Sequence, residues 1–147
     1  MDGQQVAAQF FGSWKLISCE RKSEDGRIDY RYGKNPVGRL TYDSAGRMSA
    51  QLMRLGRRST LASGVGFEAG NASDEELREA AEGYIAYFGT FDVDESSKTV
   101  THHVKAALVP SWVGTDLKRT YRFESNRLIL TAVSTSVSEL TWEREPD

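Results

Sequence analysis

The chain has 147 residues, 39% hydrophobic and 27% charged, so it can form a folded core and has the length of one domain, residues 1–147. Its 19 basic and 21 acidic residues give a net charge of -2, which excludes the basic surface typical of nucleic-acid-binding proteins. No apolar run approaches the roughly 20 residues of a membrane-spanning helix. The first residues lack the basic start of a secretory signal. We therefore expect a cytoplasmic monomer or homodimer, with no nucleic-acid or membrane partner.

Metal and nucleotide cofactors are not expected. Cys19 is the only cysteine, so an intrachain disulfide and a cysteine-based zinc site are excluded. His102 and His103 are adjacent, and neighbouring strand residues point to opposite faces, so they cannot hold one ion together. Gly64 and Gly66 do not form a phosphate-binding loop, because the required strand and helix do not flank them. A single inward histidine can still ligate haem iron if the pocket is large.

The first third of the chain predicts one short helix and a series of strands. Aromatic and apolar residues four apart favour a helix or turn over residues 4–11. The period then changes to two, which predicts a strand over residues 13–22. A weaker segment, residues 27–32, lies between two turn signals. Residues 37–42 and 47–53 flank a four-residue loop and predict a hairpin.

The next segment differs from this alternating pattern. Residues 54–72 are rich in glycine and lose periodicity, so we interpret them as a long loop and residues 56–70 as a candidate lid. Ser73 and Glu76 have the spacing of a capping box, which predicts one amphipathic helix near residues 73–83. Five further strands are expected at residues 84–93, 99–109, 116–124, 127–134 and 138–144.

The expected strands suit one architecture. Eight substantial antiparallel strands in sequence favour an all-β, up-and-down barrel, because closure removes the exposed edges of an open sheet. Such a barrel is either filled by side chains or holds one small ligand.

Two distinctive sequence blocks lie on the first and last expected strands. Gly12-Ser13-Trp14 opens the first strand, and Leu140-Thr141-Trp142-Glu143-Arg144 lies on the last. Together with five further blocks, they resemble the lipocalin-like domain family of bacteria and fungi. The resemblance implies a lipocalin-like, calycin-type barrel in which Trp14 packs under Arg144 as the barrel closure, an arrangement that cation–π attraction stabilises. It does not define an activity, since one fold hosts many sites. The other blocks are residues 36–42, 46–51, 87–90, 100–104 and 112–115.

Alternation along each strand predicts which side chains point into the barrel. On the strand after residue 99, we expect Val100, His102, Val104, Ala106 and Leu108 inside and His103 in solvent. Four further predictions complete the inward set: Leu117, Arg119, Tyr121 and Phe123 on the next strand; Leu128, Leu130, Leu140, Trp142 and Arg144 on the last two; Trp14, Leu16, Ser18 and Glu20 on the first; and Ile85, Tyr87, Phe91 and Val93 on the fifth. A one-residue bulge would reverse these assignments.

Two inward polar residues are candidates for chemistry. A buried guanidinium needs a partner, so Arg119 pairs either with Glu20 or with a carboxylate or carbonyl of a ligand. His102 is either a general acid or base, with an ordinary pKa near 6.5, or a hydrogen-bonded core histidine.

A pocket for a small molecule is the leading functional hypothesis. We expect binding of one apolar or amphipathic ligand inside the barrel. The alternative is a cofactor-free cyclase or isomerase of a natural-product pathway, with His102, Arg119 and Tyr87 as catalytic candidates. A third possibility is a solid barrel that acts through its surface. The candidate ligand-binding residues are Tyr42, Met53, Tyr87, His102, Trp112, Arg119 and Tyr121.

Overall fold

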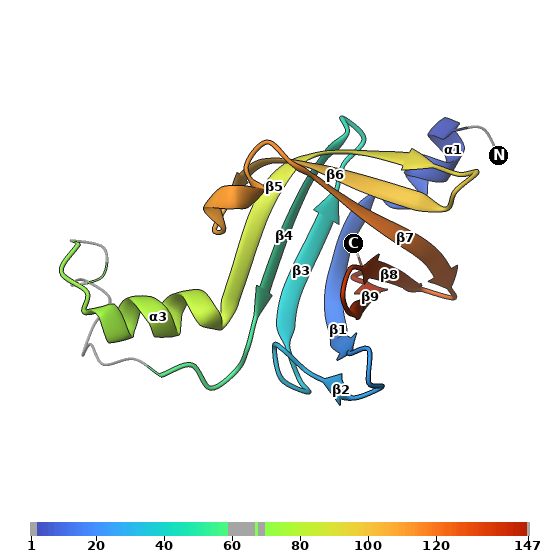
Figure 1. The fold of residues 1–147 in the computed structure, drawn as a ribbon. Helices are drawn as coiled ribbons and strands as arrows, with labels where there is room; N and C mark the ends of the chain where they lie inside the picture. Colours follow the sequence, from blue (N-terminus) through green and yellow to red (C-terminus); the bar gives the residue numbers. More distant parts are fainter. Residues whose placement is uncertain (1–2, 59–66, 68–69, 147) are drawn as a thin grey trace.

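The computed structural model describes residues 3–58, 67 and 70–146, and its strands form a closed antiparallel barrel (Figure 1). Strands β1 and β3 to β9 follow one another around the barrel, and β1 pairs with β9 to close it. The short β2 pairs only with the end of β1. This is the predicted eight-stranded up-and-down barrel with one weak extra strand. The strands are β1 (Gly12–Lys22), β2 (Ile28–Asp29), β3 (Val37–Tyr42), β4 (Arg47–Met53), β5 (Tyr84–Asp94), β6 (Thr99–Ala107), β7 (Asp116–Glu124), β8 (Arg127–Val133) and β9 (Val137–Arg144).

Two helices and a 3₁₀ turn accompany these strands in the described part of the chain. Helix α1 (Gly3–Ala8) lies at one end of the barrel, and α3 (Asp74–Glu82) projects from the start of β5 (Figure 1). The predicted cap of α3 is present, because Ser73 accepts a hydrogen bond from the Glu76 backbone at 3.2 Å. The 3₁₀ turn η1 (Pro110–Trp112) connects β6 and β7. The candidate lid over residues 56–70 lies largely outside the described residues.

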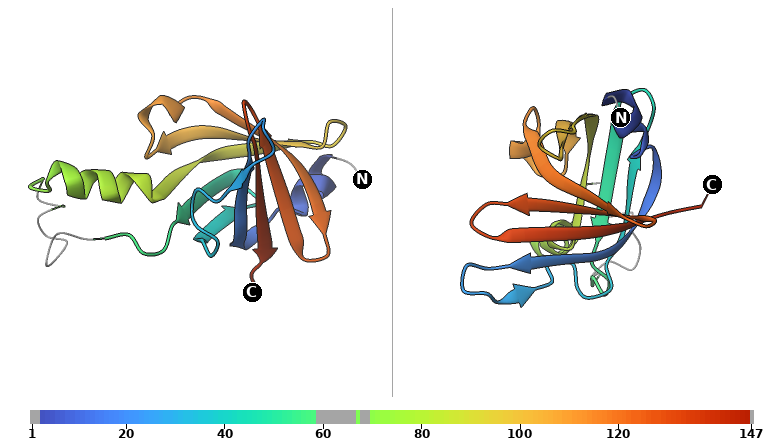
Figure 2. Two further views of the ribbon diagram at one scale, coloured as in Figure 1. Left: turned by 60° about the horizontal axis from the view of Figure 1, so that its bottom comes forward. Right: turned by 90° about the vertical axis from the view of Figure 1, so that its right-hand side faces the viewer.

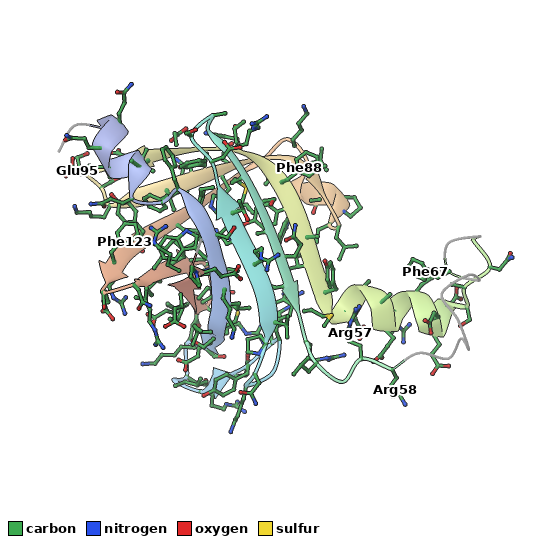
Figure 3. The ribbon with its side chains drawn as sticks, turned by 180° about the vertical axis from the view of Figure 1, so that it is seen from behind. Arg57, Arg58, Phe67, Phe88, Glu95 and Phe123 are labelled. Atoms are coloured by element: carbon green, nitrogen blue, oxygen red, sulfur yellow. The ribbon has the colours of Figure 1, made fainter. Side chains whose placement is uncertain are left out.

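An aromatic cluster closes the α1 end of the barrel. Phe10 follows α1 and is 0% exposed. Its ring packs edge-on against the rings of Tyr42, Tyr121 and Phe123 at 4.9 to 5.3 Å, a favourable aromatic geometry. Phe123 lies on the side of the barrel near α1 (Figure 3). These rings occupy this end of the barrel.

A bulge in β1 changes the predicted face of two residues. The β1–β9 register shifts between Leu16 and Ser18, where Figure 2 shows β1 running beside β9. The extra residue reverses the alternation. Ser18 and Glu20 were expected inside, and this prediction is wrong: Cys19 is buried and Arg21 reaches the barrel interior instead.

A second bulge has the same effect at the end of β6. Gly89 pairs with Val104, whereas Phe88 pairs with Ala106, so one residue of β6 is skipped. Ala106 and Leu108 were expected inside, and this prediction is wrong: Ala106 pairs with Phe88, whose side chain is exposed on the outer surface, and Leu108 is exposed as well. Before the bulge, Val100 and His102 face inward as predicted. The remaining β5 prediction is also correct, because Ile85 and Phe91 are buried and Tyr87 points inside.

Candidate functional site

The barrel contains a cavity of about 400 Å³ at the end opposite α1. Every strand except β2 contributes to its wall, together with the segment before β3, the turn η1 and the β8–β9 turn. The two ends therefore differ, because aromatic rings fill one and the other remains hollow. The lining residues are Cys19, Arg21, Arg31, Tyr32, Leu40, Ala50, Leu52, Ile85, Tyr87, His102, Trp112, Arg119, Leu130, Ala132, Ser134, Thr135, Ser136, Ser138, Leu140 and Trp142.

His102 is held between two tyrosines from two other strands. The hydroxyl of Tyr42 on β3 lies 2.6 Å from Nε2, and the hydroxyl of Tyr87 on β5 lies 2.8 Å from Nδ1. His102 and Tyr42 are each 1% exposed. Tyr87 borders the cavity, where the ring of Trp112 packs edge-on against it at 5.7 Å. A hydrogen-bonded path thus runs from the core to the cavity wall.

Burial keeps these three groups uncharged at neutral pH. Burial lowers the pKa of His102 to about 3, and the positive charges of Arg119 and His103 act in the same direction. Burial also raises the pKa of Tyr87 to about 12, with the Arg119 charge opposing the rise. The pKa of Tyr42 is raised well above its ordinary value for the same main reason. His102 is therefore a neutral imidazole between two neutral phenols.

Arg119 lines the same cavity without a carboxylate partner. It lies opposite the fully buried Val100 on β6 and is half-buried. Its Nη1 donates to the Lys118 carbonyl at 3.0 Å, and among the described residues it makes no ion pair. Glu20, the internal partner considered from the sequence, lies on the other face of β1 because of the bulge. The Arg119 charge is thus available to the cavity.

The structure brings most, but not all, of the expected site residues together. His102, Arg119, Tyr87 and Trp112 line the cavity, and Tyr42 reaches it through His102. Two expected residues lie elsewhere. Met53 is on the outer face of β4, where Arg57 lies 3.3 Å from its sulfur. Tyr121 points inward but packs under Phe10 at the closed end.

The barrel closure has the expected geometry. The guanidinium carbon of Arg144 lies 4.1 Å from the ring centroid of Trp14, as the family resemblance implies.

Some residues on the cavity wall were not predicted from the sequence. Cys19 and Arg21 were missed because nothing in their strand signals the bulge. The serine-rich β8–β9 turn was missed because alternation makes no statement about turns. The turn residues on the cavity wall are Ser134, Thr135 and Ser136.

The histidines are not arranged to hold a metal ion. Both ring nitrogens of His102 have phenol partners, so neither is free to ligate haem iron. His103 faces outward as expected, between the carboxylates of Asp92 and Asp116, and these raise its pKa. No group of three or more metal-ligating side chains occurs in the described part of the chain.

An antiparallel barrel that is closed at one end and holds a ligand-sized cavity at the other defines a class of small β-barrel proteins with an internal pocket. The chain belongs to the lipocalin-like domain family, whose pattern it matches over residues 11–145. It is 35% identical over 112 residues to the 4'-hydroxy-3'-methoxypropiophenone carrier protein ppsC of Aspergillus oryzae. That alignment covers 67% of this chain and 97% of the relative.

A solved structure can also be aligned with the chain. A mutant of the fluorescent protein UnaG aligns with a TM-score of 0.42 and 9% identity, over 95% of this chain and 98% of that protein. Within the residues that the structure describes, none of the helices has the length and apolarity needed to cross a membrane.

Proposed function

We propose that this protein is a carrier that binds one small aromatic or amphipathic molecule in the barrel cavity. The observation that carries the proposal is the cavity of about 400 Å³, whose wall is mostly apolar or aromatic and includes Arg119, an arginine without a carboxylate partner among the described residues. Two further arginines border the cavity: Arg21, which pairs with Asp29, and the exposed Arg31. Pockets of this kind bury the apolar part of a ligand and orient it through a few polar groups. The printed name of the Aspergillus relative, a carrier of an aromatic ketone, supports the same class of ligand.

The geometry favours binding over catalysis. A general acid or base works best with a pKa near the working pH, whereas the pKa of His102 is about 3. Both of its ring nitrogens are also occupied by tyrosines. A cofactor-free cyclase or isomerase using His102, Arg119 and Tyr87 is thus the second candidate, and it differs from a carrier only by turnover.

Calorimetric titration with 4'-hydroxy-3'-methoxypropiophenone tests the proposal. We expect binding with a stoichiometry of one, and a loss of affinity of about three- to tenfold for Trp112→Ala, because an aromatic contact at the cavity wall is removed. Val113→Ala is the matched control, since Val113 is the next residue, is exposed and does not line the cavity. Equal effects of the two substitutions would place the ligand outside this cavity.

Native mass spectrometry of protein purified gently from its own host extends this test to unknown ligands. A retained small molecule that is lost on denaturation supports the carrier. Chromatography of the released compound after incubation distinguishes a carrier, which returns it unchanged, from an enzyme. An empty protein that also binds no aromatic ketone would contradict the proposal.

The cytoplasmic location and the monomeric or homodimeric state stay predictions, which cell fractionation and light scattering test.

A further inference from the structure

The tyrosine–histidine path has a direction that burial determines. A neutral imidazole has one nitrogen that donates a hydrogen bond and one that accepts. Because His102 is neutral and both nitrogens have a tyrosine hydroxyl within 2.8 Å, one tyrosine donates to the ring. The other tyrosine accepts from the ring and keeps its own hydroxyl proton for a different partner.

Tyr42 is the tyrosine that donates. It is buried among the rings of Phe10 and Phe91, at 5.3 and 4.6 Å, and in the described structure its hydroxyl has no hydrogen-bond partner except Nε2 of His102. If Nε2 carried the proton, the Tyr42 hydroxyl proton would be buried without an acceptor, which is unfavourable because a buried donor then stays unsatisfied. Tyr87 does not have this restriction, because it borders the cavity.

The path therefore ends in a proton that faces the cavity. Tyr42 donates to Nε2, and the protonated Nδ1 of His102 donates to the Tyr87 oxygen. The Tyr87 hydroxyl proton is then left to donate into the cavity, to water or to a ligand.

The rest of the cavity wall is also rich in donors. Arg119 has no carboxylate partner, and the indole N–H of Trp142, another lining residue, is buried without a hydrogen-bond partner in the described structure. None of the described residues on the wall is an aspartate or a glutamate. The hydroxyl groups of the β8–β9 turn can donate or accept, but every charged side chain that the described structure places on the wall is an arginine: Arg21, Arg31 and Arg119. A ligand ammonium would therefore meet like charges here, whereas an oxygen acceptor would meet several donors.

We propose that Tyr87 and Arg119 form a donor pair that selects ligands with a carbonyl or anionic oxygen, and that Tyr42 is a positioning residue that sets this polarity through His102. This inference rests on the proposed function, because it assumes a ligand in the cavity. It adds the chemical feature by which that ligand is recognised. A site with unpaired donors discriminates against a molecule that lacks the matching acceptor, because the buried donors then stay unsatisfied.

Two dyes with the same ring system test the selection. 8-Anilino-1-naphthalenesulfonate has an anionic oxygen group, and N-phenyl-1-naphthylamine is the same skeleton without it. We expect the sulfonate dye to bind more tightly, and Arg119→Met to weaken it by about tenfold or more while the neutral dye changes little. Tyr87→Phe is expected to reduce the same preference severalfold. Lys118→Met is the matched control, because Lys118 is the adjacent cation on the outer face of β7.

The outcomes separate the selection from the proposed function. If both dyes bind, and with equal affinity in wild type and Arg119→Met, the donor pair is contradicted while the carrier function stands. If neither dye nor any aromatic ketone binds, the proposed function fails.

The ¹⁵N spectrum of histidine-labelled protein tests the role of Tyr42 without any ligand. Protonated and unprotonated imidazole nitrogens resonate far apart, and His103→Asn assigns the signals of His102. We expect one tautomer in wild type, with the proton on Nδ1, and a mixture in Tyr42→Phe. The tautomer with the proton on Nε2 in wild type would overturn the inference, and so would an unchanged single tautomer in a folded Tyr42→Phe protein.

Discussion

Arg144 on the last strand lies over the ring of Trp14 on the first strand, with the guanidinium carbon 4.1 Å from the ring centroid. The two residues also bind three successive carbonyl groups after α1. Arg144 donates to the oxygens of Gln9 and Phe11 at 2.6 and 2.7 Å, and the Trp14 indole donates to that of Phe10 at 2.9 Å. The contact between the first and last strands therefore also positions the Phe10 ring in the core.

Replacing Arg144 with lysine should destabilise the protein although the charge is kept. A lysine cannot donate two directed hydrogen bonds from a planar group while stacking on Trp14. We expect the free energy of unfolding in urea to fall by about 1–3 kcal/mol. Arg39→Lys is the control, because the side chain of Arg39 pairs with Glu145 at the surface and makes no other hydrogen bond or ion pair in the described part of the chain. Its substitution should cost less than about 0.5 kcal/mol. Equal losses would show that the stacked geometry adds nothing.

Truncation of Phe10 should have the largest effect on stability outside the cavity. The ring is fully buried against aromatic partners, so Phe10→Ala leaves a void and is expected to cost about 3–5 kcal/mol in urea denaturation. Phe88→Ala removes a ring that is 51% exposed on the outer face of β5 and should cost less than about 1 kcal/mol. A small loss of unfolding free energy for Phe10→Ala would contradict the role of Phe10 in filling the α1 end of the barrel.

Alternation predicted the barrel and the inward position of His102, Arg119 and Tyr87, because period-two patterns carry that information directly. It did not predict that the tyrosines meet at His102, since Tyr42 and His102 are 60 residues apart and their contact depends on closure of the sheet. The strands could be predicted from local sequence, whereas the hydrogen-bonded path could not.

The two bulges explain the wrong faces. The bulge in β6 had a signal in the sequence, because Gly89 lies opposite it on β5 and a glycine inside a strand often marks a bulge. A Cβ at Gly89 would collide with the His103 carbonyl oxygen. The bulge beside Ile17 has no such marker. Its consequence is functional, since it moves Glu20 to the outer face, away from Arg119, and turns Cys19 toward the cavity.

Acidification should destabilise the protein through His102. Its pKa is about 3 when folded and near 6.5 when unfolded, so between these values the unfolded chain binds the extra proton. The free energy of unfolding then falls by about 1.4 kcal/mol per pH unit below about pH 6.5. His103 acts oppositely, because its raised pKa adds stability that is complete below about pH 6.5 and is lost as pH rises through the folded value.

Urea titrations at about pH 7 and about pH 4.5 measure this effect. The loss of stability on acidification should be smaller in His102→Gln than in wild type by roughly 2–3 kcal/mol. Comparing each protein with itself at the two pH values removes the constant cost of the substitution. Subtracting the loss of the variant from that of wild type then removes the contribution of the carboxylates, which both proteins share. His103→Gln should instead increase the loss on acidification. The same acid sensitivity in wild type and His102→Gln would mean that the imidazole is not buried as a neutral group.

Cys19 should react slowly in the folded protein and report on the cavity. It is 7% exposed, and burial raises its pKa to about 11, against the lowering effect of Arg31 and Arg21. The reactive thiolate is therefore about a hundredfold scarcer than at the ordinary pKa near 9. Iodoacetamide labelling followed by mass spectrometry should be complete in urea and slow in buffer, with Cys19→Ser as the unlabelled control. Because Cys19 lines the cavity, a bound ligand should slow labelling further, and a ligand that binds without this protection would occupy another part of the molecule.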